Sequence, residues 1–237
     1  MMDGRLPNTI AIVTGGSKGI GLAIGKALAR EGSHVVLAAR ALNELHAATE
    51  EIRRLGYSAS AVRTDITNDG QVQALVEGTV ERYGTVDLLV NNAGIGVFAP
   101  VAELSVADFD AMWNVNMRGV FLATRAVLPA MMKARSGAIV NIASLAGKNA
   151  LKGGAGYCAT KWALRGFSSS LMLEVREHHI RVVTIFPGSV ATGFSQHGKQ
   201  GPNITQPEDV AEAVIFAVTA PERSMFSEID VRPTNPA

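Results

Sequence analysis

The chain contains a single cysteine, which limits how its fold can be held together. Cys158 has no second cysteine with which to pair, so an intrachain disulfide is excluded. A single cysteine fits a protein of a reducing compartment, and we expect a cytoplasmic protein. Residues 1–5 contain no basic segment followed by a long apolar stretch, so we expect no secretory signal.

Long apolar runs and an excess of one charge are also missing. No run approaches the ~18 apolar residues of a membrane-spanning helix. The 22 Lys and Arg against 21 Asp and Glu leave a net charge of +1, so we expect neither nucleic acid nor a membrane surface as partner. The five histidines show no metal-ligand spacing, and we expect no metal site. The 237 residues, 47% hydrophobic, can form one globular domain over residues 1–237.

Short β-branched runs alternate with longer helical patterns along the chain. The expected strands are residues 10–14, 34–38, 58–62, 87–90, 138–142, 181–186 and 229–231. The expected helices run from the first glycine-rich loop to residue 29, then over 42–55, 72–83, 108–133, 157–177 and 208–218. Near-continuous apolar strands indicate burial on both faces, and the alternation indicates right-handed crossovers between parallel strands. The sequence therefore predicts a single doubly wound α/β domain of Rossmann type, with a mainly parallel sheet of about seven strands.

A glycine-rich loop, residues 14–21, follows the first expected strand and precedes a helix. Its glycines Gly15, Gly19 and Gly21 allow the backbone to approach a pyrophosphate closely, and the helix N-terminus offers unpaired N–H groups. Their spacing departs from the G-x-G-x-x-G dinucleotide fingerprint. A glycine-rich turn without a ligand is the alternative, but the strand before and the helix after favour a nucleotide site.

The end of the second expected strand indicates which nucleotide binds. Its last residues, Ala38-Ala39-Arg40, include no carboxylate of the kind that usually holds the ribose 2′-hydroxyl of NAD. The planar guanidinium of Arg40 suits a 2′-phosphate, and Lys18 adds a second positive charge. We therefore expect NADP(H) in preference to NAD(H). The alternative is that both side chains face only water.

Tyr157 and Lys161 are four residues apart in an expected helix, so their side chains share one face. A free tyrosine has a pKa of ~10, and a nearby positive charge favours the phenolate and lowers that pKa. Lowering it to about 7 takes roughly 4 kcal/mol. Most Tyr-x-x-x-Lys pairs are ordinary helix surface, but a phenol tuned in this way suits carbonyl–alcohol chemistry.

These features together resemble the short-chain dehydrogenase/reductase family over nearly the whole chain. The motifs that carry the resemblance are the glycine loop, Asp65 in RTDI, NNAG at 91–94, Asn116 in WNVN, Ser144 in NIAS, Tyr157 with Lys161, and FPGSVAT at 186–192. They occur in the family's order, each at the expected strand end or helix. The resemblance implies hydride transfer between a nicotinamide and a carbonyl or secondary alcohol.

The resemblance also implies the roles of individual residues. The implied catalytic residues are Asn116, Ser144, Tyr157 and Lys161. Tyr157 would donate a proton to the substrate oxygen and Ser144 would orient that oxygen. Lys161 would lower the pKa of Tyr157 and hold the nicotinamide ribose, while Asn116 would support a water in a proton relay. The implied cofactor-binding residues are Gly15, Ser17, Lys18, Gly19, Ile20, Gly21, Arg40, Asp65, Ile66, Asn92, Ala93, Gly94, Tyr157, Lys161, Pro187, Gly188, Val190 and Thr192.

The substrate is less well defined. Residues 156–167 are similar to 3-oxoacyl-acyl-carrier-protein reductases, which dock their carrier through two surface arginines; Arg135 occupies one of these positions, but His178 occupies the other. Residues 229–237 lack the Gly-Gly ending of those reductases and resemble the ending of small-carbonyl reductases. We expect a small-molecule carbonyl or alcohol substrate. A dedicated carrier-protein reductase and a non-catalytic NADPH sensor are the alternatives.

Two further expectations concern the surface. Residues 193–206 would form a short substrate lid, because they contain glycines and a proline after the last motif. The helices at 108–133 and 157–177 carry more apolar positions than one sheet face needs. By family resemblance they would pair between subunits, giving a homodimer or homotetramer.

Overall fold

The structure is a computed structural model that describes residues 4–194 and 203–234. Within these residues seven strands form one sheet in the order β3-β2-β1-β4-β5-β6-β7, with every neighbouring pair parallel. The strands are β1 (Ile10–Thr14), β2 (His34–Ala39), β3 (Ala59–Arg63), β4 (Leu88–Asn91), β5 (Gly137–Ile142), β6 (Ile180–Pro187) and β7 (Glu228–Val231). The predicted Rossmann-type α/β fold is confirmed, and the sheet is parallel throughout rather than mainly so.

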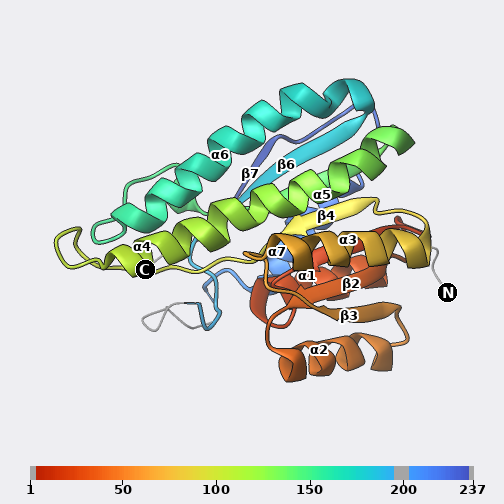
Figure 1. Ribbon diagram of the computed structural model, residues 1–237, viewed down its shortest axis with the longest axis horizontal. Helices are drawn as coiled ribbons and strands as arrows, with labels where there is room; N and C mark the ends of the chain where they lie inside the picture. The colour runs from red at the N-terminus through yellow and green to blue at the C-terminus, as the bar shows by residue number, and fades with distance from the viewer. Residues whose placement is uncertain (1–3, 195–202, 235–237) are drawn as a thin grey trace.

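Helices cover both faces of this sheet (Figure 1). They are α1 (Gly19–Arg30), α2 (Leu42–Arg54), α3 (Asp69–Tyr83), α4 (Val106–Trp113), α5 (Gly119–Ala134), α6 (Ala155–Val175) and α7 (Pro207–Val218). One buried cluster joins α1, α2 and α7 to one face, and a second joins α3, α5 and α6 to the other. No helix among the described residues is long and apolar enough to cross a bilayer.

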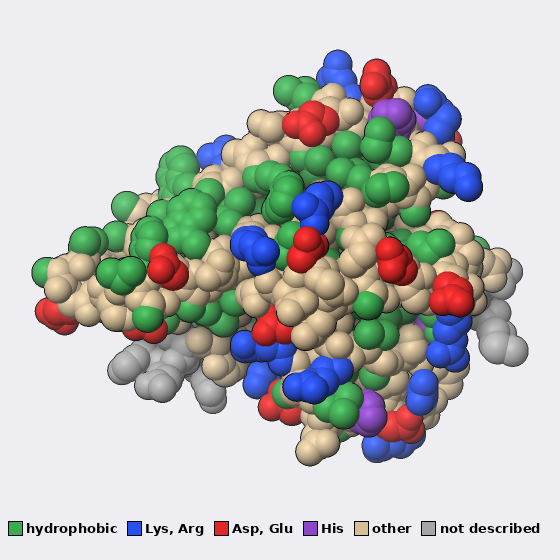
Figure 2. All heavy atoms as spheres, in the orientation of Figure 1, with side chains coloured by type: hydrophobic (Ala, Val, Ile, Leu, Met, Phe, Trp, Pro, Cys, Tyr) green, Lys and Arg blue, Asp and Glu red, His purple; other side chains and the backbone are tan. Residues whose placement is uncertain are grey.

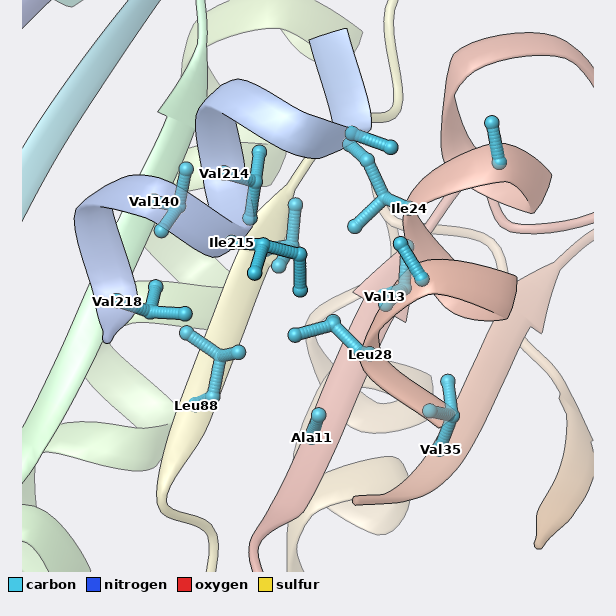
Figure 3. Packing of buried hydrophobic residues seen from close by; sticks show 14 of the residues in the cluster. Ala11, Val13, Ile24, Leu28, Val35, Leu88, Val140, Val214, Ile215 and Val218 are labelled. Carbon is cyan, nitrogen blue, oxygen red and sulfur yellow. The ribbon is translucent and has the colours of Figure 1, made fainter. Parts of the chain in front are cut away.

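Successive residues of a strand face opposite layers, which explains why the strands are apolar throughout. Ala11 and Val13 of β1 belong to the cluster under α1 and α7, whereas Ile12 belongs to the cluster under α3 and α5. Figure 3 shows the first cluster, in which side chains of α1 and α7 meet above β1 and β4. Because both faces of the sheet are buried, the strand sequences do not alternate between apolar and polar residues.

The long helix expected at residues 108–133 is interrupted. After α4 the chain continues as a π-helical stretch, Asn114–Arg118, and then as α5. All three segments follow one another as a single rod beside α6 (Figure 1). A π stretch widens the helix by one residue per turn and frequently marks a functional site. Here it contains Asn116, which is buried.

Candidate functional site

The carboxyl ends of the strands open into a cleft of about 1200 Å³. In a parallel sheet these ends lie at one edge, so the loops that follow β1 to β6 meet there. Every residue expected to contact the cofactor lines the cleft, and so does Ser144. Asn116 is the one expected catalytic residue that does not line it.

We divide the cleft into two halves. The glycine-loop half comprises the lining residues within 14–21, 38–44 and 64–66. The tyrosine half comprises Ser144, Tyr157, Lys161 and the apolar side chains around them. The segment after β6 extends along both halves. Its Thr192 lies close to the glycine loop, since a Cβ atom placed on Gly19 would be 3.5 Å from the Thr192 Cγ2.

The glycine loop turns sharply at two positions that need glycine. Gly15 and Gly19 have φ of 64° and 55°, in the left-handed region. Gly21 is required for a different reason: a Cβ atom there would lie 2.3 Å from the carbonyl oxygen of Gly15. The side-chain amide of Asn92 fixes the turn, because it donates to the carbonyl oxygens of Thr14 (3.0 Å) and Gly15 (3.1 Å). The Asn92 amide is therefore used to hold the loop.

The N-terminus of α1 has the features of an anion-binding site. The helix begins at Gly19 with no side-chain cap at Lys18 and no acidic residue in its first turn. The first N–H groups of a helix have no intrahelical partner and carry a partial positive charge. Together with the close approach enforced at Gly21, this cradle fits the pyrophosphate of a dinucleotide.

A carboxylate that sequence reasoning missed reaches the same region. Glu44, in the first turn of α2, accepts from the Ser17 hydroxyl at 3.4 Å, and its Oε2 lies 3.3 Å from the Lys18 Nζ. Glu44 was not predicted because it lies four residues beyond Arg40, in the next helix and not at the end of the second strand. Its position in the first turn of a helix, where the partial positive charge of the helix N-terminus favours an acid, could have indicated it.

Arg40 and Asp65 lie on the same side of the cleft. Arg40 is exposed. The backbone N–H and the hydroxyl of Thr67 donate to Asp65 Oδ1 at 2.9 and 2.8 Å. These two hydrogen bonds, with a smaller contribution from Arg40, hold the pKa of the Asp65 carboxyl below its usual range. Asp65 is therefore ionised at neutral pH.

Tyr157 lies in the first turn of α6 and is 6% exposed. Burial raises the pKa of its phenol to about 12, and a polar contact with the Ser144 hydroxyl opposes this shift only in part. The Ser144 oxygen also accepts from the Ala146 N–H at 3.1 Å. That bond uses an acceptor position of Ser144 and leaves its hydroxyl hydrogen free to be donated.

Lys161 is buried beside Tyr157, and its lowering of the Tyr157 pKa stays a prediction. The Lys161 Nζ lies 5.7 Å from the centre of the Tyr157 ring and donates to the Ile142 carbonyl oxygen at 3.0 Å. Burial lowers the pKa of Lys161 to about 8. Desolvation disfavours the charged form of each group, and it is the largest cause of both shifts. With a pKa of about 12, the phenol of Tyr157 is therefore protonated at neutral pH.

Asn116 makes three hydrogen bonds within the fold. Its Oδ1 accepts from the Ile95 N–H at 2.9 Å, and its Nδ2 donates to the Ile95 carbonyl at 2.9 Å and to the Thr160 hydroxyl at 3.0 Å. It thus ties the loop after β4 to the helix that carries Tyr157 and Lys161. Its suggested part in a proton relay stays a prediction.

Two aromatic side chains beside Tyr157 were also missed. The ring centres of Phe98 and Phe194 lie 5.3 and 5.9 Å from that of Tyr157. They come from the loops after β4 and β6, and no local pattern in the sequence connects them. Residues 195–202 of the expected lid lie outside the described residues. Among residues 4–194 and 203–234, no group of His, Cys, Asp and Glu is suited to a metal ion.

Comparisons with known proteins agree with this geometry. The family profile described as short chain dehydrogenase matches residues 9–203. An uncharacterised oxidoreductase of Staphylococcus saprophyticus is 36% identical over 97% of this chain and 99% of its own length. Glycine betaine reductase ATRR of Emericella nidulans is 34% identical over 97% of this chain, which spans 19% of that much longer protein.

A solved structure extends the match to three dimensions. A metagenomic short-chain oxidoreductase, crystallised in complex with NADP, has a TM-score of 0.87 and 38% identity, covering 98% of this chain and 99% of its own. The profile match covers most of the chain, and the relatives exceed 30% identity over nearly all of it. The chain is therefore an oxidoreductase of the short-chain dehydrogenase/reductase family.

Proposed function

We propose that the protein is an NADP(H)-dependent reductase of carbonyl compounds, with the oxidation of secondary alcohols as its reverse reaction. The observation that carries the proposal is the juxtaposition, in one cleft, of an anion cradle at α1 with a protonated phenol and the Ser144 hydroxyl that contacts it. The cradle suits a dinucleotide, and the two donors suit a substrate oxygen that gains negative charge.

Each polar group of the tyrosine half has a distinct task in this proposal. The cofactor supplies the hydride, as nicotinamides do. Ser144 donates its hydroxyl hydrogen to the substrate oxygen, because its own oxygen already accepts from Ala146. Tyr157 donates a proton to the same oxygen, and its pKa of about 12 keeps its phenol protonated at neutral pH. Lys161 uses one of its three donors on Ile142, which leaves two for a ribose hydroxyl.

Removal of the phenol hydroxyl tests the assignment. Tyr157→Phe should lower kcat at least ~100-fold while leaving NADPH affinity nearly unchanged, because a positioned general acid contributes a factor of that order. Tyr83→Phe is the matched control, since Tyr83 lies on α3 and does not line the cleft. NADPH consumption and NADPH fluorescence titration give the two readouts. Substantial remaining turnover in Tyr157→Phe would reject the role of Tyr157.

We propose NADP(H) over NAD(H) as the cofactor. Arg40 and Lys18 line the glycine-loop half, where two cations can receive a 2′-phosphate. Glu44 opposes this preference, because its carboxylate lies beside Lys18. The NADP complex of the metagenomic relative supports the proposal. The ratio of kcat/KM for NADPH and NADH tests it, and a clear preference for NADH would end it.

The contacts of Arg135 favour a small-carbonyl substrate over an acyl carrier protein. Arg135 ends α5 in the left-handed conformation, and its guanidinium donates to the Glu177 carbonyl oxygen at 2.8 Å. This contact gives Arg135 a role within the fold. A screen with ketones and acyl thioesters separates the two functions. NADPH binding without reduction of any of them would favour a sensor instead.

We also propose that the protein is a homodimer or homotetramer and is cytoplasmic. Figure 2 shows hydrophobic side chains gathered over α4, α5 and α6. Exposed hydrophobic residues of these three helices include Val106, Phe109, Phe121, Trp162 and Leu173. A surface of this kind marks an interaction site, and symmetric pairing would cover it. The cytoplasmic location rests on the single cysteine, which is unpaired. Light scattering tests the assembly, and a monomeric mass would contradict it.

A further inference from the structure

The tyrosine half of the cleft has apolar walls that remain exposed to solvent. Its lining includes Ile95, Phe98, Leu145, Leu151 and Phe194. Phe98, Leu151 and Phe194 are 42%, 49% and 45% exposed, which is a large fraction for such side chains next to a buried catalytic group. Apolar surface concentrated in a concave site is available to bind an apolar ligand.

Two of these side chains form an aromatic bracket, Phe98 with Phe194. Both rings contact Tyr157, at centre-to-centre distances of 5.3 and 5.9 Å. They also converge on Gly96, where an added Cβ atom would lie 3.0 Å from Phe194 Cε1 and 3.2 Å from Phe98 Cε2. Gly96 thus has no side chain to occupy the space next to both rings. Rings at such distances favour a further ring placed edge-on or offset against them.

The charges of the cleft lie elsewhere. Four of the charged residues that line it belong to the glycine-loop half: Lys18, Arg40, Glu44 and Asp65. The fifth is Lys161, which is buried and donates to Ile142. Among the described lining residues, none beside the aromatic bracket offers a cation to a substrate carboxylate. An anion bound against these apolar side chains would be partly desolvated and would meet no cation among the described lining residues of that wall.

We propose that the physiological substrate is a neutral ketone that carries an aromatic or other cyclic group next to the carbonyl; this inference rests on the proposed reductase function. The ring lies against Phe98 and Phe194, and the carbonyl oxygen faces Tyr157 and Ser144. NADPH is oxidised to NADP⁺ as its hydride goes to the carbonyl carbon, and Tyr157 supplies the proton to the oxygen. The product is the neutral secondary alcohol, and the proton of Tyr157 is restored from solvent.

Three small ketones separate ring from charge. Methyl benzoylformate carries a ring and no charge, methyl pyruvate lacks the ring, and benzoylformate keeps the ring but is an anion. We expect kcat/KM for methyl benzoylformate to exceed that for each of the other two by about tenfold or more, after division by their rates of borohydride reduction. Equal or better use of methyl pyruvate or benzoylformate would overturn the inference.

Substitutions at the bracket locate the effect. Phe98→Leu keeps an apolar side chain but removes the ring, so it should reduce the preference for methyl benzoylformate over methyl pyruvate by about threefold or more. Phe98→Ala should reduce it further. An unchanged preference in both variants would show that the ring does not bind at the bracket, and would overturn the inference.

A gain of function tests the missing cation. Leu151→Arg places a positive charge on the exposed wall, and it should raise kcat/KM for benzoylformate several-fold without raising that for its methyl ester. Leu151→Gln is the neutral control and should show no such gain. A similar gain in both variants would contradict the explanation by charge.

Failure of the inference differs from failure of the proposed function. If NADPH binds but none of the three ketones is reduced, by wild type or by Leu151→Arg, then the reductase proposal itself fails, and the substrate inference fails with it. If methyl pyruvate and benzoylformate are reduced as well as methyl benzoylformate, and Tyr157→Phe abolishes all three reactions, the reductase proposal stands and only the substrate inference is lost.

Discussion

The two halves of the cleft are built in different ways. The glycine-loop half is formed by backbone groups, glycines and exposed charges from three short segments that follow β1, β2 and β3. The tyrosine half is formed by side chains from the loops after β4, β5 and β6 and from α6. The first half is built on three neighbouring strands at one end of the sheet, whereas the second combines the loops after β4 to β6 with a helix.

This contrast has a physical consequence. In the glycine-loop half, ligand binding depends on backbone N–H groups whose positions are set by the turn itself. In the tyrosine half, chemistry depends on burial, which raises the pKa of Tyr157 and lowers that of Lys161. Substitutions in the two halves should therefore separate cofactor binding from proton transfer.

The largest effect is expected at Gly21. Gly21→Ala places a methyl group 2.3 Å from the Gly15 carbonyl oxygen, which must displace the glycine loop. We expect NADPH affinity, measured by fluorescence titration, to fall at least ~100-fold, because the backbone N–H groups of the displaced loop no longer point together at the pyrophosphate. Gly78→Ala is the matched control: a Cβ atom there meets nothing within 4 Å, and alanine in a helix interior should be neutral or stabilising by up to ~1 kcal/mol. Unchanged affinity in Gly21→Ala would show that the cradle is not needed.

The same contrast explains what could be predicted from the sequence. The order of strands and helices was visible, because apolar strands and helical periodicity are properties of neighbouring residues. The glycine loop, Tyr157 and Lys161 were visible for the same reason. The π stretch at Asn114–Arg118 was not, since its dihedral angles remain helical and only the hydrogen-bond pattern changes.

Interactions between distant segments account for the other misses. Glu44 meets Lys18 only because α2 begins beside the glycine loop. Phe98 and Phe194 both meet Tyr157 only because β4 and β6 end at the same edge of the sheet. The burial of Tyr157 and Lys161 could not be predicted either, because spacing along a helix indicates a charged neighbour but not how far both groups are buried.

Asn116 offers the next largest effect, and it should act on the tyrosine half alone. Asn116→Ala leaves the Ile95 N–H and carbonyl without their side-chain partner, and we expect the free energy of unfolding to fall by about 2–4 kcal/mol. Turnover should fall as well, because Thr160 and the helix of Tyr157 lose the same anchor. Asn114→Ala is the control, an exposed residue of the same π stretch. Denaturant unfolding and kcat would be measured; equal stability of the two variants would contradict this account.

The pH dependence should also differ between the halves. The folded pKa of Lys161 is about 8, below the ordinary value for lysine, so its positive charge is lost as the pH rises through about 8. Tyr157 stays protonated over that range. We expect kcat/KM for reduction to fall by up to tenfold per pH unit above about 8, as the charge beside the phenol disappears. NADPH binding through the glycine-loop half should change far less. A flat kcat/KM profile from pH 7 to pH 10 would show that the charge of Lys161 does not matter.

The smallest effect is expected at Glu44, and it tests the glycine-loop half by charge rather than by shape. Glu44 lies beside Lys18, which we propose to face the 2′-phosphate, so its carboxylate should repel that phosphate and compete for the ammonium. Glu44→Gln should raise the affinity for NADPH relative to NADH about threefold to tenfold, an effect limited by the exposure of both side chains. Glu50→Gln is the control, because Glu50 lies on the same helix but pairs with Arg53 and does not line the cleft. The two affinities would be compared at low and at high salt, since the gain should shrink as ions screen the repulsion. A lower ratio in Glu44→Gln would instead mean that this carboxylate fixes Lys18 in the position that receives the phosphate.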